Sequence, residues 1–136
     1  MHVVLEHPTR AHVITRTREI AVSATLRYAS TDPLAVHITF PARFSLGGEA
    51  VTWTFARTLL EEGLGTPAGI GDVHIWPCGP SHTIVEFASP QGLAMIRFDT
   101  TALHRFLLRS YAAVPPGDES LEPALDEGLM SLFGGV

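Results

Sequence analysis

The sequence predicts an α+β protein in which two antiparallel β-sheets pack with helices, in a single domain of about seven strands and three helices. Three observations predict this fold class. Several segments alternate apolar and polar residues as half-buried strands do, the period becomes helical at two places, and leucines near the C-terminus recur at helical spacing. At 136 residues the chain has the length of one domain.

The expected strands follow one another through short turns. The alternation is clearest over residues 20–28, and it continues with the same parity beyond a Ser-Thr-Asp-Pro turn at 30–33. The predicted strands are 11–16, 20–28, 34–40, 51–55, 72–76, 82–88 and 93–98. A glycine-rich stretch at 63–71 is expected to end the first helix and to form a loop.

The first helix is predicted over residues 56–64, with its leucines on one face. Arg57, Glu61 and Glu62 are expected on the opposite face, pointing away from the body. A solvated face with a supporting Arg57–Glu61 pair is the simpler interpretation, and contact with a partner is the functional alternative.

The two halves of the chain resemble each other. In each half an aromatic-rich strand leads directly into a helix, so that residues 53–60 parallel residues 96–103. The second helix is expected to begin near Asp99–Thr101, where either side-chain type can cap free amides, and to end before Pro115.

A boundary is expected at residue 116, between a domain over 1–116 and an acidic C-terminal segment over 117–136. The domain carries nine arginines and nine acidic residues, so the whole net charge of −5 comes from the five acids after residue 116. The segment is predicted to form a short amphipathic helix that packs on the domain or on a partner. Its apolar stripe consists of Leu121, Leu125, Leu129 and Leu132.

No catalytic motif is recognisable in the chain, and we expect neither enzyme activity nor a cofactor. His74, Cys78 and His82 are spaced by four residues around a predicted hairpin tip and contain zinc-ligand types, but a fourth ligand is not obvious. We therefore expect ordinary polar edge residues there and no metal. Cys78 is the only cysteine, which excludes an intramolecular disulfide and suits a reducing compartment.

The cellular compartment is expected to be the cytosol. No apolar run approaches the roughly 20 residues that a membrane helix needs, and residues 1–8 lack the pattern of a signal peptide.

Two tryptophans raise the question of nucleic-acid binding, because aromatic side chains on a sheet can stack unpaired bases. Trp53 shares its parity with neighbouring apolar residues and is expected in the core, whereas Trp76 is the better surface or interface candidate. Arg10, Arg16 and Arg18 form a local basic group. A domain without net positive charge nevertheless argues against general nucleic-acid affinity.

Four segments have the order and spacing of one known family: the block from Leu26 to Leu64, the motifs at 71–77 (GDVHIWP) and 89–92 (SPQG), and the run from Ala102 to Gly117. Through them the chain resembles the SsgA-like proteins, small actinobacterial proteins of sporulation-linked cell division, over residues 11–117. The resemblance implies a fold similar to that of the whirly single-stranded nucleic-acid binders, and a homo-oligomer, a trimer.

Functionally, the resemblance implies a non-enzymatic adaptor that positions division septa in the cytoplasm through the tubulin-like GTPase FtsZ or other family members. The alternative is a single-stranded nucleic-acid-binding module. The candidate partner-binding residues are Arg57, Glu61, Glu62, Trp76, Leu125, Leu129 and Leu132.

Overall fold

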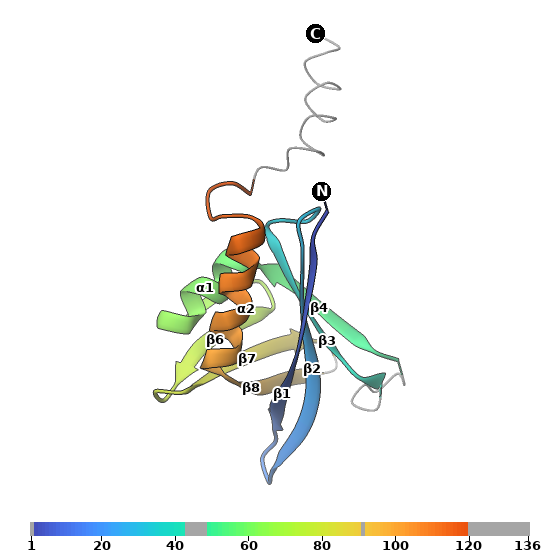
Figure 1. Ribbon diagram of the computed structural model, residues 1–136. Coiled ribbons are helices and arrows are strands. Elements are labelled where there is room, and N and C mark those ends of the chain that lie inside the picture. The colour runs from blue at the N-terminus through green and yellow to red at the C-terminus, as the bar shows by residue number, and fades with distance from the viewer. Residues whose placement is uncertain (1, 43–48, 91, 120–136) are drawn as a thin grey trace.

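The computed structural model describes residues 2–42, 49–90 and 92–119 (Figure 1). Within these residues the chain forms eight strands and two helices. In chain order they are β1 (Val4–Ile14), β2 (Glu19–Ala29), β3 (Ala35–Phe40), β4 (Val51–Ala56), α1 (Arg57–Gly65), β5 (Ala68–Ile70), β6 (Val73–Cys78), β7 (His82–Ser89), β8 (Gly92–Asp99) and α2 (Thr100–Ala113).

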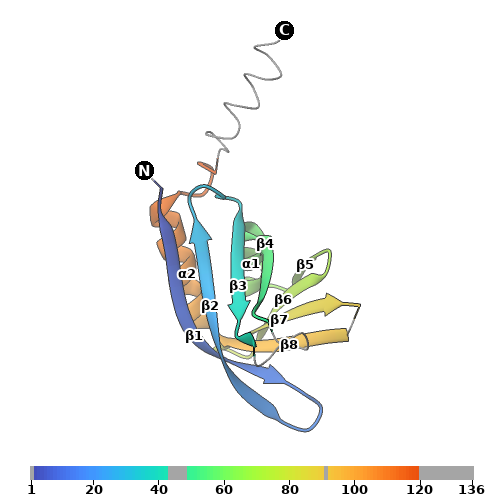
Figure 2. The same cartoon turned by 90° about the vertical axis from the view of Figure 1, so that its right-hand side faces the viewer.

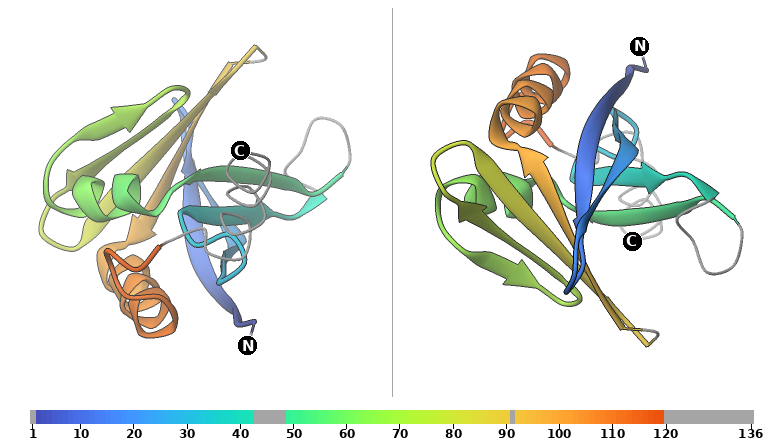
Figure 3. Two further views of the ribbon diagram at one scale, coloured as in Figure 1. Left: turned by 90° about the horizontal axis from the view of Figure 1, so that it is seen from above. Right: turned by 90° about the horizontal axis from the view of Figure 1, so that it is seen from below.

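All eight strands belong to one antiparallel sheet in the order β4-β3-β2-β1-β8-β7-β6-β5, so the expectation of two separate sheets is wrong. The long strand β1 is the reason. It pairs with β2 from Val4 to Ile14, and its last four residues, from Ala11, also pair with β8. Because one strand serves both halves, the halves are continuous, and the sheet curls around the core (Figures 2 and 3).

The internal repeat is confirmed, because each half consists of four strands followed directly by a helix. Each of the two strand-to-helix junctions is also fixed by an equivalent backbone hydrogen bond. The amide of Arg57, the first residue of α1, donates to the carbonyl of Leu34 at 2.8 Å, and the amide of Thr100, the first residue of α2, donates to Ser81 at 2.9 Å. Each acceptor lies just before the strand beside the junction.

Several boundaries differ from the prediction. Strand β1 begins at Val4 rather than at residue 11, because its whole length finds a partner in β2. The glycine-rich loop contains the short strand β5, which pairs with β6. The predicted third helix falls mostly outside the described residues, and residues 117–119 are not helical.

Asp99 is the N-cap residue of α2, but its side chain makes no capping hydrogen bond. Its carboxylate lies 3.5 Å from His82 Nε2 on the neighbouring strand instead.

The core lies on the inner face of the curled sheet and beneath both helices. Phe87 on β7 is its central contact: Trp53 on β4 stacks on it with ring centroids 4.6 Å apart, and Phe40 and Phe55 approach it at 6.0 and 6.4 Å. Strands from the two halves therefore meet through aromatic side chains. Trp53 packs against this core, as expected, but it is only half-buried.

Helix α1 approaches the sheet closely at Gly63. A Cβ atom at this position would lie 2.4 Å from both Cβ and Cγ2 of Ile75, a fully buried residue of β6. Glycine is therefore required here by the distance between helix and strand. At Gly65, the last residue of α1, an added Cβ meets nothing within 4 Å.

We expect Gly63→Ala to lower the free energy of unfolding by about 1–3 kcal/mol, because overpacking the contact with Ile75 outweighs the better helix propensity of alanine. The matched Gly65→Ala variant should be neutral or slightly stabilising. Urea denaturation followed by circular dichroism compares the two variants. Equal stability of both variants would show that the contact is not tight.

Candidate functional site

Arg57 lies in the interior at the start of α1, with 2% of its surface exposed. Its Nη1 donates to the carbonyl oxygen of Ser110 at 3.1 Å and lies 3.2 Å from the Ser110 hydroxyl. Its Nη2 donates to Oε1 of Glu119 at 2.6 Å. The guanidinium thus joins the beginning of α1, the last turn of α2 and the chain beyond α2.

The expectation that Arg57 points away from the body is therefore wrong. Periodicity over a helix of nine residues places its first residue poorly. Here the side chain passes between the rings of Tyr28 and Tyr111, with Cζ 4.9 Å from each ring centroid. Cation–π contacts on both sides of a desolvated guanidinium favour the buried position.

The helix dipoles act on this cation in opposite directions. A positive charge at the N-terminus of α1 is unfavourable, whereas at the C-terminal carbonyls of α2 it is favourable. The carboxylate of Glu119, whose side chain is only 16% exposed, compensates the remaining charge. The predicted Arg57–Glu61 pair is thus replaced by the Arg57–Glu119 pair.

The two tyrosines beside Arg57 remain neutral over a wide pH range. Burial raises the pKa of Tyr111 to about 12, and the nearby Glu61 carboxylate acts in the same direction. The Tyr111 hydroxyl is buried, and no contact of hydrogen-bond geometry reaches it among the described residues. Burial also raises the pKa of Tyr28, whose hydroxyl donates to the carbonyl of Pro33 at 2.9 Å.

Glu61 and Glu62 are exposed on the outer face of α1, as predicted. With Arg57 buried, no basic side chain of α1 shares that face, because Arg57 is the only basic residue of the helix. The outer face of α1 is therefore acidic.

Trp76 lies on the other face of the sheet. In β6, Val73 and Ile75 are buried toward α1, whereas His74 and Trp76 alternate with them and face outward. Trp76 is half-buried, and its neighbour in register on β7, Ile84, is almost fully covered. Trp76 and the acidic face of α1 consequently form two separate surfaces.

Trp76 also borders a shallow hollow of about 360 Å³ at the turn after α1. Its lining residues are Pro67, Ala68, Gly69, His74, Trp76 and Glu86. The Glu86 carboxylate lies 3.7 Å from Nδ1 of His74, so one titratable pair faces an otherwise apolar floor.

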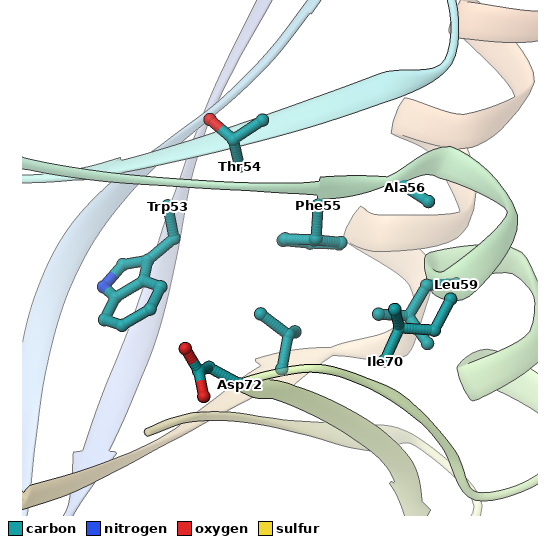
Figure 4. A pocket seen from close by; sticks show the side chains of 8 residues that line it. Trp53, Thr54, Phe55, Ala56, Leu59, Ile70 and Asp72 are labelled. Carbon is teal, nitrogen blue, oxygen red and sulfur yellow. The ribbon is translucent and has the colours of Figure 1, made fainter. Parts of the chain in front are cut away.

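A second hollow, of about 240 Å³, lies between β4 and the β5–β6 turn. Figure 4 shows Trp53 and Phe55 pointing from β4 into this space, with Ile70 and Asp72 on the opposite side. Asp72 is the only ionisable residue in its lining, and a single carboxylate supplies no acid–base pair or nucleophile with its base.

The three zinc-ligand types at the β6–β7 hairpin do not gather into a site. Cys78 and His82 are partners in register, whereas His74 lies further along β6 beside Glu86. No group of three or more histidine, cysteine or acidic side chains suited to a metal occurs among the described residues.

Of the remaining candidates, Leu125, Leu129 and Leu132 lie outside the described residues. None of the described helices is long and apolar enough to cross a membrane.

Comparison with known proteins gives a consistent result. Residues 22–119 match a family described as Streptomyces sporulation and cell division protein, SsgA. The chain is 44% identical to the sporulation-specific cell division protein SsgB of Salinispora tropica, over 94% of this chain and 96% of that protein. It is 42% identical to SsgB of Streptomyces coelicolor, over 89% of this chain and 88% of that protein.

Two solved structures have the same fold. The first is a structure from a study of SsgB mutations that correlate with longitudinal cell division during sporulation of Streptomyces coelicolor. It is 37% identical to this chain, with a TM-score of 0.77, and the match covers 88% of this chain and 94% of the other. The second is an SsgA-like sporulation-specific cell division protein of Thermobifida fusca, with a TM-score of 0.78 at 31% identity over 96% and 95% of the two chains.

We expect Arg57→Ala to lower the free energy of unfolding by about 3–5 kcal/mol, because Glu119 and the Ser110 carbonyl lose their buried cationic partner. Arg57→Lys should be more stable than Arg57→Ala but less stable than the unchanged protein, because an ammonium keeps the positive charge but lacks the planar, forked donors of the guanidinium. Urea denaturation measures both variants. The exposed Arg27→Ala is the control and should stay within about 0.5 kcal/mol of the unchanged protein; a similarly small effect at Arg57 would contradict the assignment.

The raised pKa of Tyr111 predicts a loss of stability at alkaline pH. A tyrosine whose pKa is higher in the folded state contributes its full stability below pH 10 and loses it as the pH rises to about 12. Tyr111→Phe should therefore flatten the decline of the urea midpoint over this interval, leaving the part due to Tyr28. Superimposable pH profiles of the two proteins would refute the prediction.

Proposed function

The chain belongs to the SsgA family, and from that premise we propose that it is a non-enzymatic adaptor that positions septa in sporulation-specific cell division. Its relatives are sporulation-specific cell division proteins, which supports a role in division. Their names denote no enzyme class. The adaptor would work in the cytoplasm at division septa, in contact with FtsZ, with other SsgA-like proteins, or with both.

The observation that carries the proposal is the exposed acidic face of α1. Glu61 and Glu62 project from a helix whose first residue is held by the buried Arg57 and whose Gly63 packs directly on Ile75. A charged surface fixed to a rigid support loses little conformational entropy on binding, and charge governs the rate and specificity of association. We therefore assign the contact with the division machinery to this face.

The adaptor is proposed to be a homo-oligomer, a trimer. Several copies of one acidic face, held in fixed relation, would engage neighbouring subunits of a polymer at the same time. Individually weak contacts then gain strength through avidity.

Trp76 remains a second candidate contact, on the opposite face of the sheet. Its hollow is shallow, and its cross-strand neighbour Ile84 is already covered, which gives the tryptophan a structural role as well. A nucleic-acid-binding function finds less support, because one face of the Trp53 ring is stacked on Phe87 and the domain carries no net positive charge.

We expect the double variant Glu61→Arg, Glu62→Arg to weaken binding to polymerised FtsZ by about tenfold, because it reverses the charge of the proposed contact. Co-sedimentation with FtsZ polymers measures the affinity, and a fluorescent fusion reports whether the variant still reaches septa.

The matched control is Glu6→Arg, Glu49→Arg, which changes the net charge equally at exposed positions away from α1. Equal weakening by both double variants would point to non-specific charge attraction and would sink the assignment of α1. Full binding by the α1 variant together with a loss in Trp76→Ala would move the contact to the other face of the sheet.

A further inference from the structure

The outer face of α2 combines an apolar stripe with a basic flank. This stripe consists of the exposed His104 and Leu108 and, at its edge, the half-buried ring of Tyr111, which follow one another at helical spacing. Leu108 is 52% exposed, one of the few large apolar side chains on the surface of the described residues. Arg105 and Arg109 each come one residue after a member of this stripe and are also exposed. A stripe of this kind resembles one side of a helix–helix interface.

The basic flank has no acidic partner within the described part of the chain. Neither Arg105 nor Arg109 forms a salt bridge there, and the contact of Arg109 is with Nδ1 of His7, at 3.4 Å. Burial and the two guanidinium groups lower the pKa of His7. The flank therefore presents the two arginine charges, and its surroundings disfavour a further positive charge at His7.

The described chain ends close to the C-terminal end of α2. After α2, a turn closed by a hydrogen bond from the Asp118 amide to Pro115 leads to Glu119, which Arg57 holds next to Tyr111. Residues 114–119 thus form a connection of the length that joins neighbouring antiparallel helices. This connection lies at the C-terminal end of α2 (Figure 1).

The sequence that follows has the complementary pattern. Leucines 121, 125, 129 and 132 form its stripe, and Glu122 and Asp126 each come one residue after a leucine. We propose that residues 120–136 dock as a helix, antiparallel to α2, on the outer face of α2 in the same chain. The leucines cover Leu108, while Glu122 and Asp126 lie beside Arg109 and Arg105.

The handedness of the α-helix selects the antiparallel arrangement. Each residue is rotated by about 100° from the one before it, always in the same sense. When two helices face each other through their stripes, the residues one position after each stripe lie on the same side of the interface only if the helices are antiparallel. A parallel pair would place the acidic and basic flanks on opposite sides.

The register is also consistent. Pairing Glu122 with Arg109 brings Asp126 to Arg105, because the chain advances by four residues on one helix and returns by four on the other. Helix α2 has 14 residues, and the leucine stripe spans a similar length. The outer face of α1 is a poorer surface for this segment, since Glu61 and Glu62 would repel its acids.

Disulfide trapping in the full-length protein tests the inference. In a Cys78→Ser background, which removes the exposed native thiol, Leu108→Cys combined with Leu125→Cys should form an intramolecular disulfide under mild oxidation, since facing helix positions fall within disulfide reach. The control pairs Leu125→Cys with Leu93→Cys, a leucine on β8 that is 67% exposed. The α2 pair should react roughly tenfold faster, because docking raises the effective concentration of the two thiols.

Charge-reversal variants provide a second, independent test of the docking. Arg105→Glu with Arg109→Glu should slow trapping, and adding Glu122→Arg with Asp126→Arg should restore it. Equal rates at Leu108 and Leu93, a disulfide formed only between two chains, or no restoration by the fourfold variant would each overturn the proposal. None of these outcomes bears on FtsZ binding, so the inference stands or falls separately from the proposed function.

Discussion

The burial of Arg57 sets the arrangement of both helices and of the chain that follows them. Removing a guanidinium from water costs several kcal/mol unless its donors and charge are satisfied. Here Ser110, Glu119 and the rings of Tyr28 and Tyr111 supply that compensation together. Because these groups come from β2, α2 and the connection after α2, the cation is stable only when all three are in place. The angle between α1 and α2 is thereby tied to one side chain, and so is the direction of each outer face.

A second constraint comes from strand β1, which belongs to both halves of the sheet. Its pairing with β2 over its full length and with β8 at its end joins two meanders that would otherwise form independent sheets. The continuous sheet can curl until Trp53 on the edge strand β4 stacks on Phe87 of β7, far away in strand order. The aromatic contacts close the core and the shared strand holds the halves in register, so the two interactions depend on each other.

Local patterns predicted the local structure well, and long-range partners decided the rest. The alternation over 20–28 and the change of period at residues 56 and 99 identify strands and junctions, because one buried face is enough to impose a period. Whether β1 pairs with β8 is not encoded in any local period, so one sheet could not be distinguished from two.

The acids of α1 were placed correctly. Arg57 was not, since a first helical residue can face either way and its partners lie 53 and 62 residues further along the chain. The repeat between 53–60 and 96–103 contained one signal about Arg57, because it aligns Arg57 with Thr100. The Thr100 hydroxyl lies 2.7 Å from that of Thr83 on β7, so the first residue of α2 also contacts the sheet.

The divergence of the two repeats concentrates their chemistry on opposite helices. Both helices begin at equivalent junctions, yet α1 carries glutamates on its outer face and α2 carries arginines. A domain with no net charge therefore presents an acidic face on α1 and a basic face on α2. Absence of net positive charge still argues against non-specific binding to nucleic acid, which requires many phosphate contacts at once. It does not argue against binding of a short acidic helix, because such a helix needs only two correctly spaced arginines and an exposed leucine as its contacts. In the proposed docking, the same separation would leave the acidic face of α1 open, because its glutamates repel an acidic C-terminal segment that the arginines of α2 attract.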